Sequence, residues 1–453
     1  MGDVHSFRYK DLYLVLDVES NCLHAVDELA FEAIDLLNKG LSWSQCCQSL
    51  AKYYAEADVE NVLTELKTLV EKGMLFSKKM SEIDGEEKLV KALCLHVAHA
   101  CNLRCQYCFA DAGSFGEDQF LMTLEVGQKA IDFLLEASGE RRHCEVDFFG
   151  GEPLLNFDAV KKLTRYGYQK ARKKGKIIQF TLTTNAVLMN EEAVHFLKAN
   201  NFQVILSLDG RPEVHDTMRY DGRGRGSHAA ALSGVRRFLD GSVENNYYIR
   251  GTFTAQNLDF SNDIRYLVEQ GFKRISLEPV VAPPDQSYAL KEEHLARLKK
   301  EYEMVADLYL QKAQEDQPFE FFHFNIDLER GPCLVKRLSG CGAGKEYLAI
   351  TPHGEIYPCH QFVGQRQFLM GNVLLENSFR FLPESSFPAA GPLVGECRQC
   401  WARYHCGGGC RANAYFVNGD LKRPYALGCS LQKKRLECAL YIKAKRHLEA
   451  EDQ

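Results

Sequence analysis

Three cysteines, Cys101, Cys105 and Cys108, lie on one short stretch directly after an apolar run, Leu93–Ala98. Three thiolates on a single loop are typical of an iron–sulfur cube, because each thiolate can reach a different iron. A cube has four irons, so three ligands leave one iron free to hold a cofactor. The alternatives are three buried thiols or a zinc site completed by His99, although a structural zinc usually takes its other ligands from a second pair some distance away.

A second concentration of cysteines lies near the C-terminus. Three glycines, 407–409, separate two of these cysteines and allow the backbone to fold tightly around a cluster. Four of the thiols have the spacing of a zinc knuckle, but that reading leaves three thiols over. Seven ligands suit two clusters better than one zinc ion, and Cys333 could supply an eighth. The seven are Cys341, Cys359, Cys397, Cys400, Cys406, Cys410 and Cys429.

The composition is that of an ordinary globular protein. The chain has 453 residues, of which 45% are hydrophobic and 26% charged, so two or three domains are expected. Seventeen cysteines without an export signal favour metal ligands over disulfides. No apolar run approaches the roughly 20 residues that span a bilayer, and a net charge of −6 gives no support to a nucleic-acid partner. We therefore expect a cytoplasmic protein.

Residues 1–80 predict a small module of three strands followed by three helices. The strands are expected at Phe7–Tyr9, Leu12–Val18 and Cys22–Ala25, and helices follow Asp27, Ser42 and about Asp58. This winged-helix-like order would suit DNA, but eight Lys and Arg against thirteen Asp and Glu give the module a net charge of −5. That sign argues against a phosphate partner. An exposed strand edge that captures a peptide fits better, with a linker over 81–90.

Residues 91–320 alternate between strands and helices, which predicts a parallel sheet in a partial (β/α)6 barrel, open on one side. The expected strands are Ala92–Ala98, Glu145–Phe149, Ile177–Thr183, Gln203–Ser207, Tyr247–Phe253 and Arg274–Glu278. In such folds chemistry gathers at the carboxyl ends of the strands. The three-cysteine loop follows the first strand, and polar or glycine-rich turns follow the next three. These turns contain Gly150, Gly151, Glu152, Asn185, Ser207 and Asp209, with Arg219 a little further on.

These motifs together resemble the radical SAM superfamily. The match rests on Cys-x3-Cys-x2-Cys after strand one, Gly-Gly-Glu-Pro after strand two and the polar strand ends. Residues 321–453 resemble a SPASM domain with two auxiliary [4Fe-4S] clusters, and residues 1–80 resemble a precursor-peptide recognition element. The stretches beginning at Cys341 and Ile356 look most like the SCIFF peptide maturases, which form thioether links in a small cysteine-rich ribosomal peptide.

The resemblance implies a role for each matching position. Cys101, Cys105 and Cys108 would hold the reducing cluster, and S-adenosylmethionine would chelate its free iron. Cys341, Cys359 and Cys410 would bind the first auxiliary cluster, completed by Cys333 or by a substrate thiolate. Cys397, Cys400, Cys406 and Cys429 would bind the second. The residues expected around S-adenosylmethionine are Tyr107, Gly150, Gly151, Glu152, Asn185, Ser207, Asp209 and Arg219. Six further thiols match no ligand pattern: Cys22, Cys46, Cys47, Cys94, Cys144 and Cys438.

The implied activity is that of a radical SAM oxidoreductase. A 5′-deoxyadenosyl radical would take hydrogen from an acceptor residue of the peptide, expected to be Thr, and a peptide cysteine would then bond to that carbon. The partners would be the precursor peptide, held by its leader, and a reductase or a flavodoxin or ferredoxin. One alternative is an anaerobic sulfatase-type maturase, for which no carboxylate base stands out in the sequence. The other is a zinc-containing transcriptional regulator.

Overall fold

The computed structural model describes residues 2–79, 89–116, 118–241, 246–328, 340–375, 387 and 395–451. Cys333 and most of the predicted linker lie outside these ranges. Within them, no helix is both long enough and apolar enough to cross a membrane.

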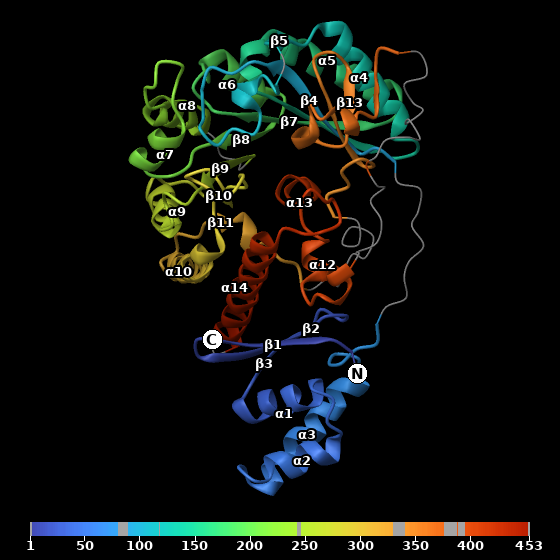
Figure 1. The fold of residues 1–453 in the computed structure, drawn as a ribbon, viewed down its shortest axis with the longest axis vertical. Helices are drawn as coiled ribbons and strands as arrows, with labels where there is room; N and C mark the ends of the chain where they lie inside the picture. The colour runs from blue at the N-terminus through green and yellow to red at the C-terminus, as the bar shows by residue number, and fades with distance from the viewer. Residues whose placement is uncertain are drawn as a thin grey trace.

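The centre of the molecule is a parallel sheet built from the six predicted strands. In spatial order these are β4 (Ala92–His99), β6 (His143–Gly150), β7 (Ile177–Thr184), β8 (Gln203–Ser207), β9 (Tyr247–Phe253) and β10 (Arg274–Pro279). The sheet does not close: β11 (Glu320–Phe321) forms one edge, and β12–β14 extend the other. The predicted α/β fold with an open, barrel-like parallel sheet is confirmed (Figure 1).

Alternation along the strands separates the two faces of this sheet. On β6, Cys144, Val146 and Phe148 are buried in the main core, whereas Asp147 and Phe149 point to the opposite, inner face. The helices that follow the strands supply the rest of this core. They are α4 (Leu124–Ala137), α5 (Phe157–Lys173), α6 (Glu191–Ala199), α7 (Pro212–Met218), α8 (His228–Leu239), α9 (Phe260–Glu269) and α10 (Leu295–Gln314).

The C-terminal segment has more regular structure than its sequence suggests. Its strand β12 (Tyr347–Ile350) pairs in parallel with β4 and continues through β13 (Glu355–Tyr357) to β14 (Gly371–Asn372). Pairing covers the otherwise open edge of β4. The helices are α12 (Arg403–Cys406), α13 (Arg411–Asn418) and the long α14 (Ala426–Glu451). The helix α14 buries residues on several sides rather than along one stripe.

The N-terminal segment forms the predicted three-stranded antiparallel sheet, β1 (Val4–Tyr9), β2 (Leu12–Asp17) and β3 (Leu23–Val26). Three helices follow: α1 (Glu28–Asn38), capped by Asp27, α2 (Trp43–Leu50), capped by Ser42, and α3 (Glu56–Glu71). One face of the sheet packs on these helices, and the other packs on α14, where Tyr9 stacks on Tyr441 at 4.3 Å. Figure 1 shows α14 between this sheet and the barrel.

Candidate active site at the open end of the barrel

The three-cysteine loop is fastened to a distant segment by its backbone. Arg104 N donates to Tyr220 O at 2.7 Å, and Gln106 N donates to Met218 O at 2.8 Å. The acceptors lie at and just beyond the end of α7, after the fourth barrel strand. The loop carrying Cys101, Cys105 and Cys108 is therefore held across the end of the sheet rather than left as a free surface loop.

Two glycines at the end of β6 allow the backbone to approach this loop closely. Gly150 has a positive φ of +130°, and a Cβ at this position would stand 2.2 Å from Ala98 O. A Cβ on Gly151 would stand 2.3 Å from Ala100 O. Gly151 N and Glu152 N donate to those two carbonyls at 2.8 and 2.9 Å. A side chain at either glycine would collide with one of these carbonyls. Only glycine therefore allows this turn to hold the backbone that leads into Cys101.

Glu152 ties the glycine turn to the end of the third barrel strand. Its Oε1 accepts from Thr184 Oγ1 at 2.7 Å and from Leu154 N at 3.0 Å, and its Oε2 accepts from Asn185 N at 2.8 Å. Burial raises the pKa of this carboxyl group to about 7. In turn, Asn185 Nδ2 donates to Asn102 Oδ1 at 2.8 Å. Glu152 and Asn185 thus form a continuous link from β7 to the cysteine loop.

Tyr107, Asp209 and Arg219 form a second buried link. Tyr107 OH donates to Asp209 Oδ2 at 2.5 Å, and Arg219 Nη1 donates to the tyrosine oxygen at 2.9 Å. Thr252 N on β9 donates to Asp209 Oδ1 at 3.0 Å. Arg219 Nε is buried without a hydrogen-bond partner among the described residues. Ser207 stands apart from this link, opposite Arg250 in the β8–β9 ladder.

The inner face of the sheet carries charged residues that sequence reasoning missed. Glu278 Oε1 on β10 lies 2.7 Å from His323 Nε2, and its Oε2 lies 3.4 Å from Arg435 Nη2 on α14. Burial alone would raise the pKa of Glu278, but His323, Arg435 and Arg250 together hold it well below its ordinary value. Glu278 is thus an ionised carboxylate, and its charge also raises the pKa of Cys410.

A second missed residue is His360, which follows Cys359 directly. Its Nδ1 lies 3.1 Å from Tyr347 OH, and its ring packs 5.1 Å from that of Phe149. Burial and the charge of Arg250 lower its pKa to about 4. Apart from His360, which lies in the stretch beginning at Ile356, no local motif marks these residues, because they come from β9, β10, η4 (Phe322–Phe324), η5 (His360–Phe362) and α14. Only the fold brings them to one place.

The C-terminal thiols lie near enough to influence one another electrostatically in two groups. The charges of Cys410 and Cys341 add to burial in raising the pKa of Cys359 to about 12. In the other set, Cys406, Cys397 and Cys400 add to burial in raising the pKa of Cys429 to about 11. In the described part of the chain, no three His, Cys, Asp or Glu side chains converge closely enough to hold a single metal ion.

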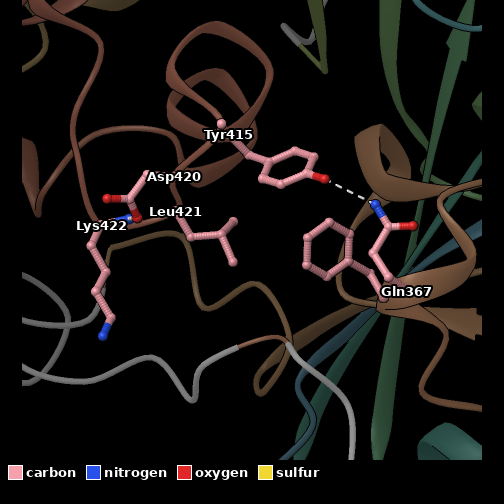
Figure 2. A pocket seen from close by; sticks show the side chains of 7 residues that line it. Gln367, Tyr415, Asp420, Leu421 and Lys422 are labelled. Carbon is pink, nitrogen blue, oxygen red and sulfur yellow. Dashed lines mark hydrogen bonds between the residues drawn. The ribbon is translucent and has the colours of Figure 1, made fainter.

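A groove runs along the free edge of β3. Its volume is about 740 Å³. Its walls come from three segments: Asn21–Ala25 with Met74, Ile326–Leu328, and the face of α14 from Lys443 to Leu448. A smaller hollow of about 440 Å³ lies between α13, the residues after it and η6 (Arg366–Phe368). Figure 2 shows Gln367 Nε2 donating to Tyr415 OH across that hollow, at 2.9 Å. No predicted site residue lines either hollow.

Comparison with known proteins adds a family match to this geometry. Residues 85–232 match the family described as a 4Fe-4S single cluster domain. The chain is 31% identical over 200 residues to an uncharacterised protein of Methanocaldococcus jannaschii, of which it covers 63%, using 43% of its own length. It is 28% identical to a cysteine-type anaerobic sulfatase-maturating enzyme of Clostridium perfringens, with 69% of this chain and 86% of that one aligned. It is 26% identical to the mycofactocin maturase MftC of Mycolicibacterium smegmatis, with 75% and 83% aligned.

Two solved structures share the fold. The structure of native anSMEcpe with bound AdoMet has a TM-score of 0.66 at 23% identity and covers 78% of this chain and 99% of its own. Streptococcus suis SuiB bound to the precursor peptide SuiA has a TM-score of 0.53 at 17% identity and covers 94% and 98%. The chain is thus similar in sequence to a sulfatase-maturating enzyme and a mycofactocin maturase, and it shares the fold of the two solved structures.

Proposed function

We propose that this protein is a radical SAM enzyme that forms Cys-to-Thr type thioether cross-links in a ribosomally made, cysteine-rich precursor peptide. The observation that carries the proposal is the presence of three thiol sets, one at the open end of the barrel and two in the C-terminal segment. A peptide substrate is supported by the relatives, which are maturases of sulfatases and of mycofactocin.

The residues present fit the proposed groups. Cys101, Cys105 and Cys108 are half-buried thiols on one loop, which suits a cube with one iron left open. When bound, the cluster and S-adenosylmethionine would supply the radical that takes hydrogen from the peptide. The glycine turn fixes the backbone that leads into the loop, and Arg219 Nε is a buried donor free to meet a carboxylate. The two C-terminal sets would hold two auxiliary [4Fe-4S] clusters.

The chain's own residues would then orient the peptide. Glu278 is a carboxylate within electrostatic reach of Cys410, so it is placed to accept a hydrogen bond from the peptide beside that thiol set. Arg250 is exposed on the inner face and makes no hydrogen bond to another described side chain, so its guanidinium is available to peptide carbonyl groups.

The leader of the precursor peptide would bind in the β3 groove. Asp17 N donates to Cys22 O, so these two residues form a hydrogen-bonded pair. Hydrogen-bonded and non-hydrogen-bonded pairs alternate along an antiparallel ladder. The N–H and C=O groups of Leu23 and Ala25 therefore point away from β2. An extended peptide can add to this edge as a fourth strand. Tethering the leader there raises the concentration of the core peptide at the active site.

The first test is the iron and sulfide content of the anaerobically reconstituted protein. Three cubes require about twelve irons per chain, and the Cys101→Ala/Cys105→Ala/Cys108→Ala variant should keep about eight. Four irons or fewer with bound zinc would overturn the cluster assignment. Incubation with a cysteine-rich precursor should then remove two hydrogens per link, read by mass spectrometry.

The relationship to sulfatase-maturating enzymes favours one second candidate, oxidation of a cysteine or serine to an aldehyde. Glu278 is a buried carboxylate that the sequence alone did not reveal, although its lowered pKa makes it a weak base. The two products are easily separated, because an aldehyde reacts with a hydrazide probe and a thioether does not. Labelling of the product by the probe would replace the thioether proposal with this one.

A further inference from the structure

The five residues between Cys400 and Cys406 are held by the N-terminal module. Trp401 stacks on His5 with ring centroids 3.7 Å apart and planes 3° from parallel. Arg403 and Tyr404 both bind Glu19, and His405 Nε2 lies 2.8 Å from Asn21 Oδ1. Of the five, only Ala402 makes no such contact among the described residues. Two predicted cluster ligands are therefore joined by a segment that rests on residues almost 400 positions away in the sequence.

Glu19 is the centre of this contact. The side chains of Glu19 and Arg403 are each only 2% exposed. One carboxylate oxygen of Glu19 accepts from Arg403 Nη2, and the other accepts from Tyr404 OH at 2.9 Å. Arg403 Nη1 donates to Cys400 O at 3.1 Å. The guanidinium thus connects a carboxylate of the module directly to the backbone of a predicted ligand, Cys400.

Removing one partner of such a buried charge pair is strongly destabilising, because the other charge stays buried and uncompensated. Asp3 Oδ2 lies 3.0 Å from Arg403 Nη2, but the Asp3 side chain is 58% exposed and is a weak substitute. Metal-site residues that do not themselves bind the metal but orient its ligands commonly change metal affinity 10- to 100-fold when mutated. The position of Arg403 matches that description.

The same turn also borders the β3 groove. Asn21, which contacts His405, donates through Nδ2 to Asp327 O at 3.2 Å, and both Asn21 and Asp327 line the groove. The turn from Val18 to Asn21 therefore touches the Cys400–Cys406 loop on one side and the proposed leader site on the other.

We propose that Glu19 is a positioning residue for the second auxiliary cluster: through Arg403 it fixes the Cys400–Cys406 loop, so the N-terminal module is a structural part of that cluster's site. This proposal rests on the proposed function, because it needs a cluster on the second thiol set. Binding free energies are reciprocal. A leader that shifts the Val18–Asn21 turn must therefore shift the stability of this cluster, and the loaded cluster must shift leader affinity by the same factor.

The test uses the full chain, reconstituted anaerobically, with Glu19→Gln compared with Asp11→Asn. Asp11 pairs with Lys445 at 3.1 Å across the same boundary between module and body, but contacts no cysteine loop. Iron release to a chelator is followed per chain, and the clusters are titrated by electron paramagnetic resonance. A Cys429→Ala variant identifies the signal of the second auxiliary cluster.

We expect Glu19→Gln to release about four of twelve irons roughly tenfold faster and to shift the reduction potential of the second cluster alone. Asp11→Asn should release iron as wild type does. Equal rates and potentials in wild type and Glu19→Gln would overturn the proposal, as would an effect of Asp11→Asn of the same size. If Glu19→Gln does not fold, Tyr404→Phe removes a single hydrogen bond to Glu19, and the same selective change is expected in smaller degree. A wild-type protein without twelve irons would instead contradict the proposed function itself.

Discussion

At the scale of single residues, the best-determined feature of the site is the contact between its two glycines and the cysteine loop. The carbonyls of Ala98 and Ala100 occupy the space where side chains would stand at Gly150 and Gly151. Those carbonyls accept hydrogen bonds from the same turn, so the turn and the loop form one rigid backbone unit. A single methyl group added at either glycine can therefore push the turn and the cysteine loop apart.

Gly151→Ala should therefore damage the first cluster without touching a ligand. The new Cβ would meet Ala100 O at 2.3 Å and Gly113 Cα at 2.8 Å, and Ala100 directly precedes Cys101. We expect the free energy of unfolding to fall by about 2 kcal/mol and iron per chain to fall toward eight. Gly222→Ala is the control, because nothing lies within 4 Å of its Cβ position. Equal iron in both variants would contradict the expectation.

Asp147, on the inner face of β6, gives a prediction of pH dependence. Burial raises its pKa to about 6, although Thr181 Oγ1 donates to it at 2.7 Å. A carboxyl whose pKa is raised by folding stabilises the protein below its unfolded pKa of about 3.9 and loses that contribution as pH rises through about 6. From pH 5 to 7 the stability of wild type should fall, relative to Asp147→Asn, by on the order of 1 kcal/mol. Urea unfolding at several pH values measures this, and a difference independent of pH would count against it.

Much of the site follows from sequence because its residues are locally marked. Cys101, Cys105 and Cys108 are close in sequence, and the glycine turn and Asn185 directly follow strands that apolar periodicity predicts. Glu278, His323 and Arg435 could not be found in this way. Each is an ordinary polar residue in its own segment, and their proximity depends on β10, η4 and α14 converging.

At the scale of elements, β3 is an edge strand with a groove beside it. The sheet order is β1-β2-β3, so β3 pairs only with β2. The outward backbone groups of Leu23 and Ala25 face the groove whose opposite wall is α14. These unpaired groups are available to a peptide. Because the edge is short and partly covered, it does not offer a long template for aggregation.

Ala25→Pro should weaken leader binding and leave the sheet intact. Proline removes the outward N–H and is tolerated on an edge strand whose N–H faces away from the neighbouring strand. We expect the dissociation constant of a labelled leader peptide to rise about tenfold, because the variant loses one backbone hydrogen bond to the peptide and the close packing around that bond. Ala25→Val keeps the N–H and should bind as wild type does. Fluorescence anisotropy measures both, and equal affinities would exclude strand addition at β3.

The helix α14 shows why the C-terminal elements were harder to predict. Sequence reasoning looks for one apolar stripe, but α14 packs against α10 on one side and against the N-terminal sheet on another. Arg435 Nε donates to Tyr302 OH on α10 at 2.8 Å, and Cys438 lies 3.4 Å from Tyr9 OH on β1. A helix with two partners has apolar residues around most of its circumference and loses the helical period.

At the scale of the whole molecule, the N-terminal segment divides between two cores. Phe7, Tyr9, Leu14 and Leu16 of its sheet belong to the main core with the barrel and α14. The helices α1–α3 form a separate, smaller core with Val4 and Val15. The sheet is therefore shared, and its contacts with the Cys400–Cys406 loop belong to the main body.

This division predicts the order of local unfolding. Segments open independently when few buried contacts join them to the rest. We expect amide hydrogens of β1 and β2 to exchange as slowly as those of β4 and β6, whereas α1–α3 should exchange sooner, by opening without the barrel. Hydrogen exchange read by mass spectrometry resolves these peptides. Joint, early exchange of β1–β3 with α1–α3 would mean that the module opens as one unit. The sheet could not then position the Cys400–Cys406 loop, because it would unfold while the loop stayed folded.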